Sequence, residues 1–332
     1  MIRVALIGAG FIGRVHARNL AAHPQVDFAL VHDIDPERAA DLARHVGAQA
    51  ATDLDAVFGA PVIDAVLIAS STDTHADYLG RAAAAGKAVF CEKPIDLDTE
   101  RARQAVTVVA AAGVPAMIDF NRRFDQHHAE LRRSVAEGEV GAVELVQMTT
   151  RGPRLPPIEY VKVSGGQMKD QTVHFFDLLR WITDDEPVEV FAMGAVLADP
   201  RIGQAGDVDT SVVTLRMRSG ALCQIDSARR TGYGYDERIE VFGATGLVES
   251  RRQRHRGVSR YLGDKVIDDG LHAGWYERVQ ASYFHALDAF VHALNQGIPP
   301  APSLDDGLRA QRIAEAATQS LRTRAPVTIQ DN

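Results

Sequence analysis

The sequence predicts an α/β chain in which an N-terminal doubly wound parallel sheet is followed by an α+β domain with a large, mainly antiparallel sheet. Up to about residue 119, short apolar runs alternate with helical segments, as in a parallel sheet covered by helices. Later strand-like runs follow one another and are joined by short turns that contain glycine, which is typical of antiparallel pairing. The predicted domains are residues 1–121 and residues 122–332, and the last helices either cover the second sheet or return to the first domain.

The chain begins with a strand and a glycine-rich turn. A strand is predicted at residues 3–7, because residues 4–7 form a short apolar run typical of a strand buried on both faces. Gly8, Gly10 and Gly13 follow in the spacing G-x-G-x-x-G. A helix is predicted to open after Gly10. In this pattern the first glycine allows the tight turn, the second lets the backbone approach a diphosphate, and the third lets helix and strand pack closely. The free N–H groups at the start of the helix would bind the diphosphate.

A second apolar run, at residues 27–32, ends in Asp33, twenty residues beyond Gly13. In a Rossmann domain that binds a dinucleotide, a carboxylate at this place accepts hydrogen bonds from the adenosine ribose. Asp33 could instead be a solvated turn residue before the helix that starts near Pro36. The order of strand, glycines, helix, strand and acid favours dinucleotide binding. Because Asp33 would repel a 2′-phosphate, NAD is favoured over NADP, although Arg38 lies close enough to weaken that preference.

The remaining elements of the first domain continue the alternation. Strands are predicted near residues 48–51 and at 65–69, 88–91 and 116–119, with helices at 36–46, 73–85 and 98–112. A ligand of such a sheet lies at the carboxyl ends of the strands. Ser70, Thr72 and His75 leave one strand at this edge, so the hydroxyl groups of this segment could contact the nicotinamide end of the cofactor or simply cap the next helix.

The fifth strand ends in Glu92, Lys93 and Pro94, again at the carboxyl edge. A lysine beside a glutamate is usually a surface pair. Here the edge is where a ligand sits, and Pro94 restricts Lys93 to an extended backbone, which would fix the direction of its side chain. Cys91 is predicted to be a small buried apolar residue and not a nucleophile. The predicted cofactor contacts are Gly8, Gly10, Phe11, Ile12, Gly13, Asp33, Ser70, Thr72, His75, Glu92 and Lys93.

The composition argues against several classes of function. A net charge of −8 disfavours a nucleic-acid or anionic-membrane partner, and the one basic cluster, residues 251–256, is predicted to be a solvated loop. The only cysteines, Cys91 and Cys223, lack metal-binding spacing, so we expect no metal site, reduced thiols and a cytoplasmic location. No apolar run approaches the roughly eighteen residues that a membrane span needs.

The second domain begins with a helix at about residues 124–137. Further strands are predicted at 143–150, 187–196, 210–217, 221–228, 238–242 and 247–250, and helices at about 275–295 and 304–322. Such a sheet should have one face over the active site and one face free to associate. We therefore expect a homodimer or homotetramer.

A helix is also predicted after Gly165 and Gly166, and it places three polar residues on one face. Asp170, His174 and Asp177 recur at i, i+4 and i+7. A lone histidine on an apolar helix is more often a satisfied core residue than a catalytic group. Here the aspartate four residues earlier could fix the imidazole and support its protonated form, as a general base requires. The spacing by itself leaves both interpretations open.

These motifs together resemble one known family. The glycine motif, the Glu-Lys-Pro triplet at 92–94 and the double glycine followed by Asp170 and His174 resemble the Gfo/Idh/MocA family of NAD(P)-dependent sugar and polyol oxidoreductases over essentially the full length. Three further segments look like those of inositol 2-dehydrogenases: residues 120–125, 229–243 and 299–310. The resemblance implies oxidation of a secondary hydroxyl of a cyclic polyol or sugar to a ketone, with an inositol as the leading candidate.

The resemblance also implies roles for individual residues. Lys93 would hydrogen-bond the reacting hydroxyl, His174 would take its proton, and Asp170 would orient the substrate or His174, while the hydride passes to C4 of the nicotinamide. Residues expected to contact the polyol are Asn121, Arg123, Tyr233 and Tyr235, together with Arg229 and Asp236. The loop that contains both tyrosines could instead pack on the sheet or form a subunit interface.

Some residues depart from the family pattern. Phe175 stands where many relatives carry an aspartate, and Gln167, Met168 and Lys169 replace a more apolar stretch. Lys169 adds a positive charge, so an acidic sugar or another cyclic polyol stays open as the substrate. Two other functions also stay open: an enzyme that uses NAD only transiently to break a glycosidic bond, and a dinucleotide-binding regulatory protein without turnover. Retention of all three predicted catalytic residues argues against the last.

Overall fold

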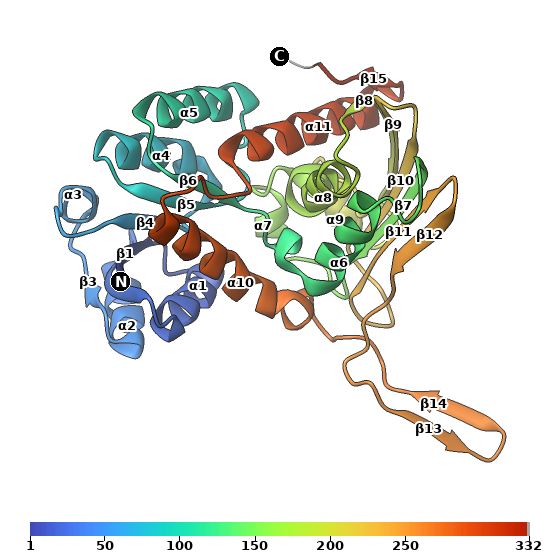
Figure 1. The fold of residues 1–332 in the computed structure, drawn as a ribbon, viewed down its shortest axis with the longest axis horizontal. Helices are drawn as coiled ribbons and strands as arrows, with labels where there is room; N and C mark the ends of the chain where they lie inside the picture. The colour runs from blue at the N-terminus through green and yellow to red at the C-terminus, as the bar shows by residue number, and fades with distance from the viewer. Residues whose placement is uncertain (331–332) are drawn as a thin grey trace. The chain divides into compact units, whose positions relative to one another are not determined.

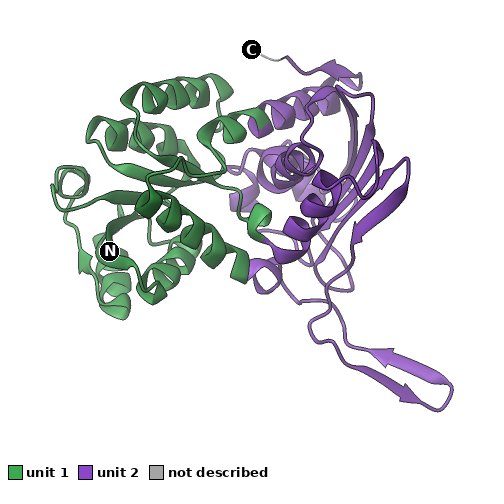
Figure 2. Ribbon diagram, in the orientation of Figure 1, with its two compact units in different colours: residues 1–124, 281–309 green, residues 125–280, 310–332 purple. Residues whose placement is uncertain are grey.

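The computed structural model describes residues 1–330, which form two compact units. Unit 1 consists of residues 1–124 and 281–309, and unit 2 consists of residues 125–280 and the chain from residue 310 onward (Figure 2). Each unit is built around one large sheet (Figure 1). Unit 1 therefore combines two stretches that lie far apart in the sequence.

Unit 1 contains a six-stranded parallel sheet in the order β3-β2-β1-β4-β5-β6. Its strands are β1 (Ile2–Ile7), β2 (Val26–His32), β3 (Gln49–Ala50), β4 (Ala65–Ile68), β5 (Ala88–Glu92) and β6 (Ala116–Asp119). β1 lies between β2 and β4, so that Ile7 is opposite both His32 and Ile68. This is the strand order of a doubly wound sheet, so the predicted Rossmann architecture is confirmed, and its ligand crevice is expected outside the carboxyl ends of β1 and β4.

Helices join these strands: α1 (Phe11–Ala22), α2 (Pro36–Val46), α3 (Leu54–Phe58), α4 (His75–Ala84) and α5 (Thr99–Ala112). Local signals set their ends. Asp35 and Asp98 cap α2 and α5 by accepting hydrogen bonds from first-turn N–H groups, and Gly47 and Gly113 end the same helices in the left-handed conformation. The helix expected at residues 73–85 instead begins with a 3₁₀ turn, η1 (Thr72–Thr74), and α4 starts only at its end.

The central strands of unit 1 are buried on both faces, as their continuous apolar runs predict. Val4, Leu6 and Leu67 are at most 2% exposed. The later part of helix α10 (Trp275–Gln296) belongs to this core, because Phe290 packs on Phe90 with ring centroids 5.4 Å apart. A segment from near the end of the chain therefore covers the first sheet, as one of the two alternatives for the last helices had it.

Unit 2 contains a seven-stranded sheet in the order β12-β11-β7-β10-β9-β8-β15. Its strands are β7 (Val143–Arg151), β8 (Pro187–Ala195), β9 (Thr210–Met217), β10 (Leu222–Ala228), β11 (Asp236–Gly243), β12 (Gly246–Ser250) and β15 (Val327–Thr328). Only β7 and β10 pair in parallel, so the prediction of a mainly antiparallel sheet is confirmed. Alternate residues of β9 and β10 are buried, as expected for a sheet covered on one face.

The helices of unit 2 are α6 (Gln126–Ala136), α7 (Ile158–Val161), α8 (Val173–Thr183), α9 (Pro200–Gln204) and α11 (Leu304–Thr323), whose first turns belong to unit 1. Helix α8 contacts β7, and α6 contacts α8. These contacts explain why α8 is apolar nearly all round: it lies between the sheet and a second helix. No helix within residues 1–330 combines the length and the hydrophobicity that crossing a membrane would require.

Unit 2 also has a hairpin that the sequence did not predict, formed by β13 (Ser259–Leu262) and β14 (Lys265–Asp268) and visible as a projecting arm in Figure 1. Every residue of both strands is exposed. Because neither strand has a buried face, their residues need not alternate between apolar and polar. That alternation is the pattern by which a strand is recognised in a sequence. The basic segment before the hairpin has no strand or helix, only an isolated bridge between Arg254 and Leu271.

Candidate active site

The three glycines after β1 have different surroundings. Gly8 has a φ of +103°, and a Cβ there would lie 2.4 Å from the carbonyl oxygen of Ala69. A Cβ at Gly13 would lie 2.0 Å from the carbonyl oxygen of Gly8, whereas a Cβ at Gly10 would meet nothing within 4 Å. The fold itself therefore needs Gly8 and Gly13. Gly10 leaves open space at the start of α1, which has no side-chain cap, so the turn fits a diphosphate that approaches the helix N–H groups.

Asp33 is tied to this glycine turn. Its Oδ2 accepts a hydrogen bond from the N–H of Ala9 at 2.7 Å, and its Oδ1 accepts one from the N–H of Asp35 at 2.9 Å. Arg38 lies between two carboxylates, with Nε 3.9 Å from Asp33 Oδ1 and Nη2 3.2 Å from Asp35 Oδ2. The Asp33 carboxylate thus fixes the end of β2 beside the turn, and the charge of Arg38 is already balanced.

The polar segment after β4 is linked to the segment after β5. His75 is 1% exposed, and its ring nitrogens lie 2.8 Å from the carbonyl oxygen of Pro94 and 3.1 Å from that of Ser70. Ser70 Oγ lies 2.7 Å from Thr74 Oγ1, and Thr72 is half-buried in η1. The His75 ring therefore holds together two of the loops at the carboxyl edge of the sheet.

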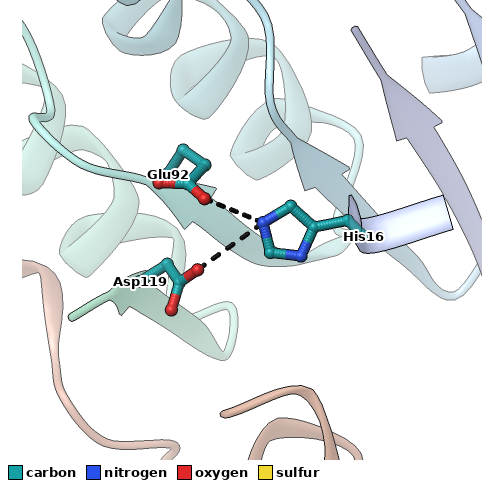
Figure 3. A group of neighbouring side chains, drawn as sticks. All are labelled: His16, Glu92 and Asp119. Atoms are coloured by element: carbon teal, nitrogen blue, oxygen red, sulfur yellow. Dashed lines mark hydrogen bonds and ion pairs between the residues drawn. The ribbon is translucent and has the colours of Figure 1, made fainter. Parts of the chain in front are cut away.

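Glu92 points into the interior of unit 1, toward His16 of α1 (Figure 3). Its Oε1 lies 2.8 Å from His16 Nε2, and its Oε2 accepts a hydrogen bond from the N–H of Lys93 at 3.2 Å. Lys93 itself is half-buried, and its peptide bond to Pro94 is cis. The sequence motifs assigned no role to His16, although its place among the buried α1 residues, between Gly13 and Leu20, was a usable signal.

In unit 2, Asp170 is held by two neighbours. Its Oδ1 accepts a hydrogen bond from the hydroxyl of Tyr160 at 2.7 Å, and its Oδ2 lies 3.1 Å from Arg229 Nη1. Arg229 is 4% exposed and also contacts Asp207 Oδ2 through Nη2 at 3.0 Å. One buried guanidinium therefore bridges two carboxylates and fixes the orientation of Asp170.

The segment that carries Asp170 is not a regular α-helix. Met168–Thr172 forms a π-helical turn, η3, and α8 begins after it. The helix predicted after the double glycine therefore begins with a π turn, which carries Asp170, and continues as the regular α-helix that carries His174 and Asp177. His174 and Asp177 both lie in α8, three residues apart, and are 7% and 0% exposed. Single π turns occur frequently at functional sites.

Buried amides hold this π turn against the sheet. Gln167 is fully buried, its Nε2 donates to the carbonyl of Asp209 at 3.2 Å, and its Oε1 accepts from the hydroxyl of Ser211 at 2.7 Å. Gln171 Nε2 donates to carbonyl oxygens of β7 and β10, at 3.0 Å and 3.1 Å. Phe175 is 1% exposed and belongs to the core. The polar stretch that departs from the family pattern thus satisfies buried polar groups.

Two residues expected to contact the polyol lie in unit 1. Asn121 is 1% exposed, and its Nδ2 donates to the hydroxyl of Ser282 at 2.9 Å. Arg123 Nη2 lies 3.1 Å from Asp306 Oδ1. Burial alone would raise the pKa of the Asp306 carboxyl, but the charge of Arg123 and hydrogen bonds from Ser303 hold that pKa below its usual value.

The two tyrosines that were also expected to contact the polyol lie in the loop before β11, in unit 2. Tyr235 is 6% exposed, and its hydroxyl donates to Glu237 Oε2 at 2.6 Å. Tyr233 is 47% exposed, and its hydroxyl donates to Asp236 Oδ2 at 2.9 Å and accepts from Arg151 Nη1 at 3.2 Å. Tyr235 is thus part of the interior of unit 2, whereas Tyr233 keeps an accessible ring.

Comparison with known proteins identifies the family. Residues 2–120 match the oxidoreductase family described as having an NAD-binding Rossmann fold, and residues 128–249 match the GFO/IDH/MocA C-terminal domain. The chain is 42% identical to an inositol 2-dehydrogenase of Rhizobium meliloti (strain 1021) over 328 residues, 99% of each chain. It is 39% identical to a myo-inositol 2-dehydrogenase of Thermotoga maritima over 333 residues, again 99% of each chain.

A solved structure agrees with the sequence comparison. The crystal structure of a myo-inositol dehydrogenase from Corynebacterium glutamicum ATCC 13032 superposes with a TM-score of 0.94 at 35% identity, covering all of both chains. The likeness thus extends over the residues of both units. The chain belongs to the GFO/IDH/MocA oxidoreductase family, with its NAD-binding Rossmann fold at residues 2–120 and its C-terminal domain at residues 128–249.

Proposed function

We propose that this chain is an NAD-dependent dehydrogenase that oxidises a secondary hydroxyl of a cyclic polyol to a ketone, with an inositol as the substrate. The observation that carries the proposal is the likeness to inositol 2-dehydrogenases over 99% of both chains. A protein that had kept only the dinucleotide fold would have no chemical need for Lys93, Asp170 and His174 together. A dehydrogenase function is therefore favoured over glycoside cleavage with transient use of NAD and over a regulatory function without turnover.

The residues around the glycine turn fit the cofactor. Gly10 and the uncapped start of α1 receive the diphosphate, and Asp33 lies where the adenosine ribose would be bound. Arg38 is paired with Asp35, so it is not available to a 2′-phosphate without breaking that pair. NAD is therefore preferred over NADP. When bound, NAD supplies a hydride acceptor at C4 of its nicotinamide ring.

Three side chains have separate roles in the oxidation of the substrate hydroxyl. Lys93 donates a hydrogen bond to the reacting hydroxyl and stabilises the negative charge that develops on its oxygen. His174 takes the hydroxyl proton as general base. Asp170, held by Arg229 and Tyr160, orients the substrate or His174. The oxygen thus loses its proton to the protein while its carbon gives up a hydride.

The test is NADH formation at 340 nm with a panel of inositols, aldoses and uronates. We expect one cyclic polyol to be turned over, and Lys93→Ala and His174→Ala each to lower kcat at least about 100-fold. The matched controls are Lys162→Ala and His45→Ala, which remove exposed residues of the same types and should retain activity. Tight NAD binding without NADH from any substrate would contradict the proposal, and so would cleavage of a glycoside without net NADH.

We further propose that the chain forms a homodimer or homotetramer through the outer face of its second sheet. On this face Val212, Leu222 and Phe242 come from three strands and are 42%, 47% and 42% exposed. Exposed apolar side chains gathered on one sheet face are typical of an interface. A monomer at micromolar concentration in light scattering would contradict this, and Phe242→Arg should weaken the assembly.

We also propose a cytoplasmic location, because Cys91 and Cys223 are both free and buried. Thiols in this state are usual in a reducing compartment. Fractionation of the source cells with an antibody against the chain would test the location, and recovery outside the cytoplasmic fraction would contradict it.

A further inference from the structure

A cluster of buried titratable side chains includes Glu92, the residue before Lys93, and takes no direct part in the proposed oxidation. His16 of α1, Glu92 at the end of β5 and Asp119 at the end of β6 are 0%, 6% and 1% exposed (Figure 3). His16 Nε2 lies 2.8 Å from Glu92 Oε1 and 3.5 Å from Asp119 Oδ2. Each residue comes from a different element of the sheet or its covering helix.

The distances indicate hydrogen bonding and not metal binding. One ligand atom from each of the three side chains lies within 4.8 Å of the others, which would suit a metal ion. Two atoms bound to one tetrahedral ion at about 2.0–2.1 Å are, however, about 3.3 Å apart. The 2.8 Å between His16 Nε2 and Glu92 Oε1 is the length of a direct hydrogen bond.

The same geometry locates the protons. His16 Nδ1 is buried with no hydrogen-bond partner among residues 1–330, so the tautomer with its proton on Nε2 leaves no buried N–H unsatisfied. Neither oxygen of Asp119 accepts a hydrogen bond from the described part of the chain. A buried carboxylate without donors is costly, whereas a neutral carboxyl group can share its proton with Glu92.

Burial and neighbouring charges also favour ionisation of Glu92 over ionisation of Asp119. Burial and the negative charge of Glu92 raise the pKa of Asp119 well above its usual value. Burial alone would also raise the pKa of Glu92, but the hydrogen bond from His16 and the charges nearby, including that of Lys93, lower it. Of the two carboxyl groups, Glu92 is therefore the more readily ionised.

Other titratable and charged groups also lie near this cluster. Cys91 of β5 and Tyr283 of α10 are both buried, and burial, reinforced by the charge of Glu92, raises the pKa of each well above its usual value. Arg122, in the 3₁₀ turn η2 (Asn121–Phe124), adds a positive charge near Asp119. Within this cluster, Glu92 is thus the carboxyl group that both contacts the Lys93 backbone and interacts electrostatically with Lys93.

We propose that His16, Glu92 and Asp119 are positioning residues for Lys93, which fix its backbone directly after β5 and place the Glu92 carboxylate beside it. Glu92 accepts the Lys93 N–H through one oxygen and the His16 N–H through the other. The importance of this arrangement for turnover rests on the proposed function, in which Lys93 binds the reacting hydroxyl.

The first test does not depend on turnover. The full chain is acylated with a small amine-reactive reagent over a range of pH, and modification of Lys93 is followed by peptide mass spectrometry. We expect Glu92→Gln to move the pH of half-maximal reactivity at least about one unit lower, because a nearby opposite charge is lost. Asp119→Asn should leave this pH unchanged, because the hydrogen bonds of Glu92 to His16 and to the Lys93 N–H stay in place.

Variants of His16 provide a second test of the same proposal. His16→Leu removes the donor to Glu92 and should move the Lys93 midpoint in the same direction as Glu92→Gln. His16→Gln should restore it, because an amide nitrogen can donate from nearly the same place. The control is Lys87→Met, which breaks hydrogen bonds of a buried lysine elsewhere in unit 1 and should lower thermal stability without moving the Lys93 midpoint.

Steady-state kinetics then connect the cluster to the reaction. Glu92→Gln should lower kcat about tenfold or more, because Lys93 is no longer held in the position that the reacting hydroxyl requires. The inference is overturned if Glu92→Gln and Asp119→Asn move the Lys93 midpoint equally, or if neither moves it. If the wild type turns over no polyol but the midpoint shifts as expected, the proposed function fails and the positioning of Lys93 stands.

Discussion

Gln167 allows a quantitative test of how unit 2 holds the π turn that carries Asp170, one of the proposed catalytic residues. Gln167→Met keeps the length of the side chain but leaves the hydroxyl of Ser211 and the carbonyl of Asp209 without their partner. Both hydrogen bonds are inside the unit, at 2.7 Å and 3.2 Å. A buried polar group left unpaired costs about 1–3 kcal/mol, so the variant should lose about 2–5 kcal/mol of unfolding free energy.

Urea unfolding followed by tryptophan fluorescence measures this loss. Trp181 and Trp275 are the only tryptophans of the chain, and both belong to unit 2, so the signal reports the unit that is perturbed. Ser211→Ala should cost about 1–2 kcal/mol, and the double variant should cost less than the sum by about 1 kcal/mol, because both single changes break the same hydrogen bond. Gln147→Met, on an exposed position of β7, is the control and should stay within about 0.5 kcal/mol. A loss below about 0.5 kcal/mol for Gln167→Met, or strictly additive effects, would refute the reasoning.

Three further predictions follow from the same structure. Gly13→Ala should abolish NADH binding measured by fluorescence, because its Cβ would lie 2.0 Å from a carbonyl oxygen of the glycine turn; unchanged affinity would contradict this. Burial opposes ionisation of Asp125, but nearby positive charges, including Arg278, hold its pKa well below the usual value. Its stabilising effect is therefore complete above about pH 5 and is lost progressively as the pH falls below that. Asp125→Asn should therefore destabilise the protein at pH 7 and narrow its difference from wild type between about pH 5 and pH 2; a constant difference would contradict the linkage. Cys91 and Cys223 have raised pKa values because they are buried, so neither should react with a thiol reagent until the protein is unfolded.

Local signals were enough to predict most of the fold. The ends of α2 and α5 could be predicted because proline, aspartate and glycine determine helix ends within a few residues of the chain. The parallel sheet followed from apolar runs long enough to be buried on both faces. The projecting hairpin was missed because no burial shapes its sequence, and the π turn was missed because its cause lies in amide contacts to distant strands.

The candidate site was predictable only in part. The motifs singled out the glycine turn, Lys93, Asp170 and His174, since each stands at a spacing that chemistry makes recognisable. They gave no reason to connect Glu92 to His16, which lies 76 residues earlier in the chain. They also gave no sign that the hydroxyl of Tyr235 donates to Glu237 inside unit 2.

The sequence by itself determined the type of fold, the place of the dinucleotide turn and the residue types available for catalysis, because helix ends, strand burial and glycine conformations depend on neighbours within a few positions. Only the tertiary structure decided which polar side chains face one another. Glu92 could be paired with a distant histidine, and Asp170 with a buried arginine, only once strands and helices had been packed. The physical reason is that the strength of an electrostatic contact depends on distance and burial, and neither is encoded by spacing along the chain.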